Sequence, residues 1–176
     1  MIFPAQTSRL VLRAWREDDF DAFAAMNADP RVMEYFPAPL TREESATFFG
    51  HIREEFQTEG FGLYAVERIS DGLLLGYTGL HRVTFDGLCG QIEIGWRLRA
   101  DAWGNGYAPE AAQACLALAA KLGIEEVIAF TAVANLRSQR VMQKIGMECV
   151  GQFNHPALPE GHPLRRHVLY WIGIKG

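Results

Sequence analysis

The segment Trp103–Ala108, with the sequence WGNGYA, is the part of the chain best suited to hold a ligand. Its two glycines, Gly104 and Gly106, have no Cβ, so the backbone can turn sharply and a ligand can approach it closely. A helix is expected to follow, because Pro109 suits the first helical position and Glu110 suits the positive end of the helix dipole. The first N–H groups of a helix have no partner within it and attract anions. The segment therefore predicts a phosphate-binding loop.

This loop differs from two common nucleotide-binding motifs. The P-loop pattern G-x-x-x-x-G-K-S/T does not occur in the chain. In the dinucleotide pattern G-x-G-x-x-G, the third glycine would stand at Pro109. The dinucleotide fold also places its loop near the start of a parallel sheet, whereas several antiparallel strands are expected before this one. The residues therefore argue against a nucleotide-dependent oxidoreductase.

Hydrophobic patterns predict the elements that lead to the loop. Thr41 and Glu44 form a capping box that opens the second of two helices. Tight turns at Asp71-Gly72 and Asp86-Gly87 join the last three strands into an antiparallel meander. Strands are expected over 8–15, 61–69, 74–84 and 91–98, with the two helices between the first and the second of them.

The elements after the loop alternate between helix and strand. We expect a helix over 109–121, a strand over 127–133, a helix over 135–145, and two strands over 147–153 and 166–174. The order is then β-α-α-β-β-β-α-β-α-β-β. It predicts an α/β fold (an α+β mixed sheet) with helices on both faces. The strands on either side of the first of these helices should be parallel and joined by a right-handed crossover.

Length and composition set the broad class. The 176 residues, 1–176, suit a single domain. With 17 basic and 21 acidic residues the net charge is −4, which argues against a nucleic-acid partner. Three cysteines, Cys89, Cys115 and Cys149, are too few and too widely spaced for a disulfide framework or a metal site. No signal peptide and no segment long enough for a membrane is recognised, so a cytoplasmic location is expected.

Several segments resemble one family closely. Residues 92–96 (IEIGW) and 103–111 (WGNGYAPEA), followed by 135–147, are similar to the GNAT superfamily of acetyl-CoA-dependent N-acetyltransferases. The last of them matches that superfamily's N-x-x-S-x-x-x-x-x-K-x-G-F/M segment. The ends, 7–13 and 167–170, resemble the ribosomal-protein N-terminal acetyltransferases, the RimJ/RimL-like branch. The resemblance covers nearly the whole chain and implies the GNAT-like acyl-CoA acyltransferase fold, whose parallel strand pair is splayed.

The resemblance also implies the cosubstrate, acetyl-CoA, with no metal. The family's loop pattern, Q/R-x-x-G-x-G/A, aligns with the predicted loop but has Trp103 in place of Gln or Arg. Backbone N–H groups of the loop would hold the diphosphate, and the backbone of the preceding strand would pair with the pantetheine arm. The residues concerned are Gly104, Asn105, Gly106, Tyr107 and Ala108 for the diphosphate, and Ile94, Gly95 and Trp96 for the arm. Asn135 would contact the same arm, while Arg137 and Arg140 would meet the phosphates or form a solvated helix face.

Acetyl transfer to an amine requires a neutral amine, and therefore a base. Glu93, on the strand before the loop, is the expected base; the other interpretation is a solvated or salt-bridged strand residue. The tyrosine that many members use as the acid is replaced by Met142. Ser138, on the helix face of Asn135, matches a serine proposed for the ribosomal-protein branch; a simple helix hydrogen bond is the other interpretation. Tyr170 is a weaker candidate, and the thiolate leaving without an acid stays open.

The acceptor is expected to be a primary amine, either a protein N-terminal α-amine or a small molecule, attacked directly in a ternary complex. Cys115 lies on an apolar helix face and is expected in the core. Residues 35–37, Phe61, His81 and the loop 155–166, with its histidines, are the expected acceptor walls. The histidines have no metal-ligand spacing. A non-catalytic acyl-CoA sensor or interaction module on the same fold is the alternative function. A homodimer stays open, and no membrane partner is expected.

Overall fold

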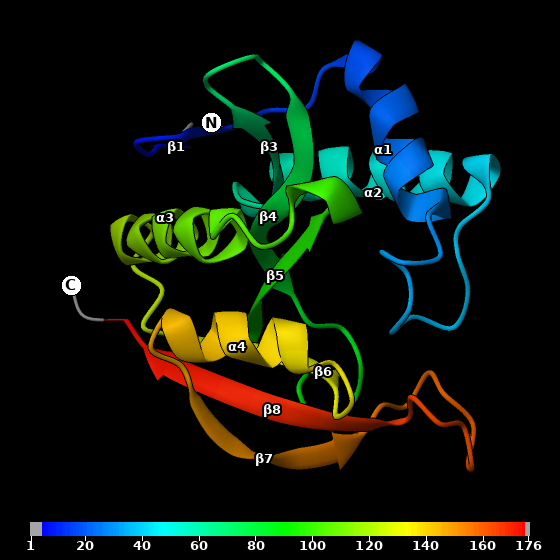
Figure 1. Ribbon diagram of the computed structural model, residues 1–176. Helices are drawn as coiled ribbons and strands as arrows, with labels where there is room; N and C mark the ends of the chain where they lie inside the picture. Colours follow the sequence, from blue (N-terminus) through cyan, green and yellow to red (C-terminus); the bar gives the residue numbers. More distant parts are fainter. Residues whose placement is uncertain (1–4, 175–176) are drawn as a thin grey trace.

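The computed structural model describes residues 5–174 of the chain. These residues form eight strands, four α-helices and two short 3-10 helices (Figure 1). The elements are β1 (Ala5–Gln6), β2 (Leu10–Arg13), η1 (Glu17–Asp19), α1 (Phe20–Ala28), α2 (Arg42–Glu59), β3 (Leu63–Arg68), β4 (Leu74–Arg82), β5 (Ile92–Leu98), η2 (Ala100–Ala102), α3 (Tyr107–Lys121), β6 (Glu126–Ala132), α4 (Leu136–Lys144), β7 (Glu148–Asn154) and β8 (Arg166–Gly173).

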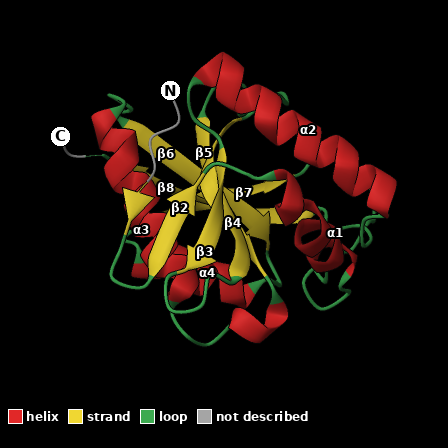
Figure 2. Cartoon of the chain, turned by 90° about the horizontal axis from the view of Figure 1, so that it is seen from above, coloured by secondary structure: helices red, strands yellow, loops and turns green. Residues whose placement is uncertain are grey.

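All eight strands belong to one mixed sheet in the order β1-β2-β3-β4-β5-β6-β8-β7. Only β5 and β6 run parallel among the described strands; the other neighbours are antiparallel. Helices α1 and α2 cover one face of the sheet, and α3 and α4 cover the other (Figure 2). The predicted fold class is therefore confirmed, with the parallel pair where the crossover helix required it.

The N-terminal strand predicted over 8–15 is wrong in its extent. Residues 10–13 of it form β2, which pairs with β1 in a small hairpin around a turn at Ser8 and Arg9. The Thr7 hydroxyl oxygen accepts the backbone N–H of Leu10 at 3.0 Å, which closes the turn. A hydroxyl that bonds to nearby backbone competes with a continuous strand, and alternation of apolar residues does not reveal it.

The start of α3 also differs from the prediction. The helix begins at Tyr107, so Pro109 is its third residue and not its first. Gly106 precedes the helix with φ of +77°, in the left-handed region. This conformation, open to glycine, lets the chain enter the helix two residues earlier than expected. Pro109 still lies in the first turn, where its missing N–H costs no helical hydrogen bond.

An aromatic cluster holds α1 and α2 against the sheet. Phe23 of α1 lies 5.1 Å from Trp15 and 5.3 Å from Phe49 of α2, measured between ring centroids. Phe48 of α2 meets Tyr77 of β4 edge-on at 5.9 Å. Aromatic pairs at such separations stabilise the packing beyond the area they bury. The cluster therefore fixes one wall of the cavity described below.

Small residues bring α3 close to β4 and β5 on the opposite face. Ala111, Ala112, Cys115 and Ala119 are fully buried along the helix. Burial raises the pKa of the Cys115 thiol to about 12, so the thiol is protonated and unreactive at neutral pH. The prediction that Cys115 belongs to the core is confirmed. Within residues 5–174, no helix has the length and apolar character to cross a bilayer.

Candidate functional site

The cavity of interest, about 1010 Å³ in volume, lies where β5 and β6 separate. These parallel strands are in register at a single pair, Glu93 with Ile128, and the rest of β5 has no partner in β6. Residues of α2, β4, β5, β6, α4 and the start of α3 line the cavity, together with the loop between α1 and α2. The splay of two strands that should pair therefore creates an opening in the middle of the sheet.

The glycine loop forms one wall of this cavity. Gly104 and Gly106 have φ of +78° and +77° and both line it, as do Trp103, Tyr107 and Ala108. Within residues 5–174, none of the backbone N–H groups of 104–108 donates a hydrogen bond. Five consecutive amides around the mouth of a helix are thus free to bind an anion.

Asn105 differs from its neighbours, because it does not line the cavity. Its side-chain Nδ2 donates to the carbonyl oxygens of Ala102 and Trp103, at 3.1 and 3.0 Å. These two bonds make the loop rigid from within. Any contact of Asn105 with a ligand in the cavity is therefore left to its backbone.

A clamp from the N-terminal hairpin fixes the loop from outside. Arg9 donates from Nη1 to the carbonyl of Asn105 at 3.0 Å and from Nε to Glu110 at 2.7 Å. Thr7 donates to the same Glu110 carboxylate at 2.6 Å. Burial alone would raise the pKa of Glu110. The hydrogen bonds from Thr7 and Arg9 together outweigh this effect, so the pKa lies below its ordinary value. Sequence patterns did not reveal this clamp, because its partners lie about a hundred residues apart.

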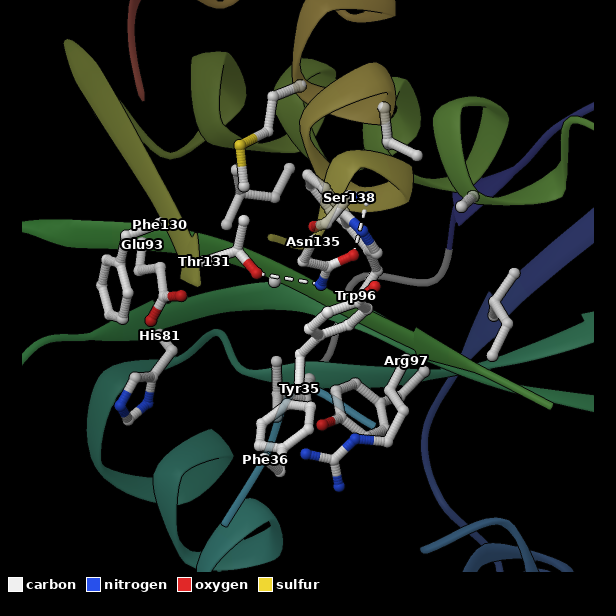
Figure 3. A pocket seen from close by; sticks show the side chains of 18 of the residues that line it. Tyr35, Phe36, His81, Glu93, Trp96, Arg97, Phe130, Thr131, Asn135 and Ser138 are labelled. Atoms are coloured by element: carbon white, nitrogen blue, oxygen red, sulfur yellow. Dashed lines mark hydrogen bonds between the residues drawn. The ribbon is translucent and has the colours of Figure 1, made fainter. Parts of the chain in front are cut away.

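At the start of α4, the side chain of Asn135 is the helix cap. Its Oδ1 accepts the backbone N–H of Ser138 at 3.2 Å, and its Nδ2 donates to the Thr131 hydroxyl at 2.9 Å (Figure 3). Asn135, Ser138 and Thr131 all line the cavity. Within residues 5–174 the Ser138 hydroxyl forms no hydrogen bond. Met142 is buried at 2% exposure, and its thioether side chain offers no hydroxyl to the cavity.

Arg137 and Arg140 also line the cavity. Arg137 pairs with Glu34 at 2.7 Å, and its guanidinium lies 4.1 Å from the ring centroid of Trp103. Both charged side chains of this pair are half exposed, so it contributes between 0 and about 1 kcal/mol. From the sequence, both arginines could either contact the phosphates of the cosubstrate or form a solvated helix face. Arg137 lies over the glycine loop, and Arg140 stays exposed at the cavity edge.

Glu93 faces the other side of the cavity and is only partly exposed. It stands opposite His81 in the β4–β5 ladder, and His81 Nδ1 lies 2.6 Å from Glu55 of α2. Burial raises the pKa of Glu93 to about 8; His81 lowers it slightly and the charge of Glu55 raises it. The hydrogen bond that His81 donates to Glu55 raises the pKa of His81 above its ordinary value. A carboxyl group that titrates near neutral pH is suited to exchange a proton with an amine.

An aromatic group closes the far end of the cavity. Its members are Phe85, Phe130, Phe153, His155 and His167, with neighbouring ring centroids 4.8 to 6.2 Å apart. Burial lowers the pKa of both histidines, so they are neutral at pH 7. No three metal-ligating side chains of residues 5–174 converge on one point.

The remaining predictions concern the acceptor walls and the weaker acid candidate, Tyr170. Residues 35–37 and His81 line the cavity as expected, whereas Phe61 is buried in the core at 6% exposure. The hydroxyl of Tyr170 bonds to Gln139 and Gln143 and does not reach the cavity. The sequence did not single out Arg97, which lies on β5 and lines the cavity. Its alternation with Glu93 and Gly95 along the strand was the available signal.

Fold and site together define an acyltransferase of the splayed-sheet type, and comparison with known proteins gives the family. A model of the acetyltransferase (GNAT) domain matches residues 9–148. The chain therefore belongs to the GNAT acetyltransferase family, as its motifs predicted.

Individual relatives agree with this assignment. The chain is 31% identical to the uncharacterized N-acetyltransferase YnaD of Bacillus subtilis (strain 168) over 157 residues, which are 89% of this chain and 88% of the relative. A GNAT-family acetyltransferase of Bacillus anthracis superposes with a TM-score of 0.82 at 28% identity, covering 99% of this chain and all of the other. A ribosomal-protein acetyltransferase, RimL, solved in complex with coenzyme A, shares the fold with a TM-score of 0.80 at 17% identity and 98% coverage of both chains.

Proposed function

We propose that this protein transfers the acetyl group of acetyl-CoA to a primary amine, by direct attack within a ternary complex. One observation carries the proposal: the amides of residues 104–108, which have no partner among residues 5–174, belong to a loop that lines the same cavity as Glu93. The loop fits a diphosphate, because Gly104 leaves open space where a side chain would otherwise project and a Cβ on Gly106 would meet only the Arg9 guanidinium, at 3.6 Å. Acetyl-CoA, when bound, supplies an acetyl group already activated as a thioester.

Each wall of the cavity has a separate task in this proposal. The amides of Gly104, Asn105, Gly106, Tyr107 and Ala108 would hold the diphosphate, with Arg137 and Arg140 beside it. The backbone of Ile94, Gly95 and Trp96 pairs with β4 but not with β6, and on the side of β6 it would pair with the pantetheine arm. The side-chain amide of Asn135 donates one N–H to Thr131, and its second N–H would donate to the pantetheine arm.

Proton transfer falls to Glu93 and Ser138. An amine attacks only when neutral, so its ammonium form must first lose a proton. Glu93 would accept that proton, directly or through water, because its raised pKa lies close to that of an α-amine. The Ser138 hydroxyl, at the cavity wall and unbonded among residues 5–174, would protonate the leaving thiolate and regain a proton from the attacking nitrogen as the amide forms. No covalent enzyme intermediate is needed.

The loop assignment is tested by substituting Gly104 with valine. Gly104→Val places a branched side chain in the diphosphate cradle and should weaken coenzyme A binding at least tenfold in a calorimetric titration. Gly72→Val is the matched control, since Gly72 has φ of +69° with open space around it and lies outside the cavity. Both variants carry the same backbone strain. Equal affinity of Gly104→Val and the unsubstituted protein would contradict the proposed cradle.

The alternative function is a non-catalytic module that binds acyl-CoA. Met142 favours it, because the buried methionine leaves α4 without the tyrosine hydroxyl that many family members use. Release of the free thiol from acetyl-CoA, measured with a panel of amines, separates the two functions. An enzyme releases thiol with at least one amine, whereas a sensor binds coenzyme A saturably and releases none.

A further inference from the structure

Arg97 of β5 is a buried arginine in an unusual environment. Only 8% of its surface is exposed, yet no carboxylate within residues 5–174 forms an ion pair with it. The one hydrogen bond that its guanidinium forms with residues 5–174 runs from Nη1 to the amide oxygen of Asn27 at 2.7 Å. Its guanidinium lies beside Phe36 (Figure 3), 4.3 Å from that ring centroid. The ring centroid of Tyr77 is 5.3 Å away.

The contrast with Arg13 shows what is missing. Arg13 is equally buried, but its guanidinium bonds to Asp19 and Glu67, so its charge is compensated. A buried charge without a counter-charge is costly, and aromatic faces compensate only part of that cost. Arg97 therefore has unused capacity for an anion.

The free atoms of Arg97 define which anion fits. Asn27 occupies Nη1, whereas Nε is buried without any partner and Nη2 bonds to none of the described residues. Nε and Nη2 form one edge of the guanidinium, with two parallel N–H donors. This edge matches the two oxygens of a carboxylate.

The position of Arg97 relates this anion to the proposed acceptor. Glu93, Gly95 and Arg97 alternate on one face of β5, and Glu93 and Arg97 are about 13 Å apart along the strand. Both side chains line the cavity, Glu93 next to Glu55 of α2 and Arg97 next to Phe36. One end of this wall therefore carries the carboxyl group of Glu93 beside the His81–Glu55 pair, and the other carries a guanidinium.

We infer that Arg97 binds a carboxylate of the acceptor, so that the acceptor is a small molecule whose amine and carboxylate stand several bonds apart, such as an ω-amino acid. The ammonium group lies toward Glu93 and the carboxylate on the Nε–Nη2 edge of Arg97. The inference rests on the proposed acetyl transfer, because it names the substrate class for the same cavity. It makes Arg97 a residue that determines specificity and does not take part in proton transfer.

The test compares acceptors that differ only in the carboxylate. The twenty L-amino acids, and the ω-amino acids from 4-aminobutanoate to 6-aminohexanoate, are each assayed beside their carboxamides. With the best pair, the carboxylate should be preferred at least tenfold in kcat/KM, the effect of about one charged hydrogen bond. An acceptor panel in which no carboxylate exceeds its carboxamide would overturn the inference.

Two substitutions locate the preference. Asn27→Asp keeps the shape of the side chain but places a carboxylate at Arg97 Nη1, which neutralises the arginine without deleting it. Arg97→Gln removes the charge. Both should abolish the preference, and Asn27→Asp should do so without lowering the melting temperature. Arg99→Gln is the control, because Arg99 pairs with Asp101 and lies outside the cavity. A preference that survives in Asn27→Asp would contradict the assignment to Arg97.

A binding measurement separates this inference from the proposed function. The coenzyme A-loaded protein is titrated calorimetrically with the same acceptor pairs, which requires no turnover. Binding that depends on the carboxylate and is lost in Asn27→Asp, in a protein that acetylates none of these amines, would support the Arg97 site and contradict the acetyl transfer. Turnover of amines and carboxamides without discrimination would support the transfer and overturn the Arg97 site.

Discussion

At the scale of single residues, the charge state of Glu93 decides what the site can do. A carboxyl group with an ordinary pKa of 4.5 is ionised throughout the physiological range and is a weak base. Burial against β4 raises the pKa of Glu93 to about 8, so the group is largely protonated at pH 7 and ionises just above it. A base of this strength accepts a proton from an amine with little free-energy cost.

Glu93→Gln should therefore change the pH dependence as well as the rate. In the unsubstituted protein, kcat/KM should rise with pH through about 8 as Glu93 ionises. The variant should lose this inflection and be slower by about 10²-fold or more at pH 9, because no base replaces the carboxylate. Coenzyme A affinity should not change. Profiles from pH 6 to 10 with one acceptor would show this, and identical profiles for both proteins would remove Glu93 from the mechanism.

Glu93 also makes the stability of the protein depend on pH, and stability should fall over the range in which activity rises. A group whose pKa is raised by folding stabilises the folded state below its unfolded pKa, and this contribution is lost as the pH rises through the folded pKa. The unsubstituted protein should therefore lose stability relative to Glu93→Gln between about pH 4.5 and 8. Melting temperatures measured across this range would test the burial of Glu93 independently of any activity.

At the scale of elements, one buried ion pair joins β2 to the start of the helical layer. Arg13 of β2 donates from Nη1 and Nη2 to the two carboxylate oxygens of Asp19, at 2.7 and 2.8 Å. Asp19 also accepts the backbone N–H of Arg16 at 2.7 Å, which forms the turn before α1. Both side chains are about 10% exposed or less. The pair therefore fixes where α1 leaves the sheet, and with it the loop that covers the cavity.

Asp19→Asn should destabilise the fold by roughly 3 kcal/mol at pH 7, because it leaves a buried guanidinium with one carboxylate fewer. Burial raises the pKa of Asp19, but the bonds from Arg13 and Arg16 lower it below the ordinary 3.8. The stabilisation is thus present above pH 4 and lost as the pH falls through the folded pKa. Asp21→Asn, which breaks the exposed pair with Arg42, is the control and should change stability by less than about 0.5 kcal/mol. A difference between the two variants that persists unchanged at pH 2 would contradict this account.

The types of the secondary-structure elements could be predicted from local sequence patterns. Contacts between segments far apart in the chain could not. The capping box of Thr41 and Glu44 predicted the start of α2, and both of its hydrogen bonds are present. The early start of α3 depends on a left-handed backbone at Gly106, which a glycine permits but does not require. Arg9 bonds to Glu110, and Arg97 forms no ion pair within residues 5–174. Both facts depend on residues that only the folded chain brings together. The sequence could therefore predict the glycine-loop wall of the cavity and, with residues 35–37 and His81, part of the remaining wall, but not Arg97.

At the scale of the whole molecule, the cavity exists because one sheet fails to close. Hydrogen bonding continues from β1 to β5 and from β6 to β7, and the two halves are in register only at Glu93 and Ile128. On the face opposite α1 and α2 (Figure 2), α3 packs against β4 and β5 and contacts α4, which packs against β6, so that these two helices join the halves. An extended ligand arm can thus lie in the sheet where a strand would otherwise be.

The most direct test of this account is a crystal structure of the protein with coenzyme A. The account predicts that diphosphate oxygens lie 2.7 to 3.2 Å from backbone nitrogens of residues 104–108, with the pantetheine arm between β5 and β6. A diphosphate bound elsewhere, with these five amides still free, would contradict the central claim and the enzyme mechanism built on it.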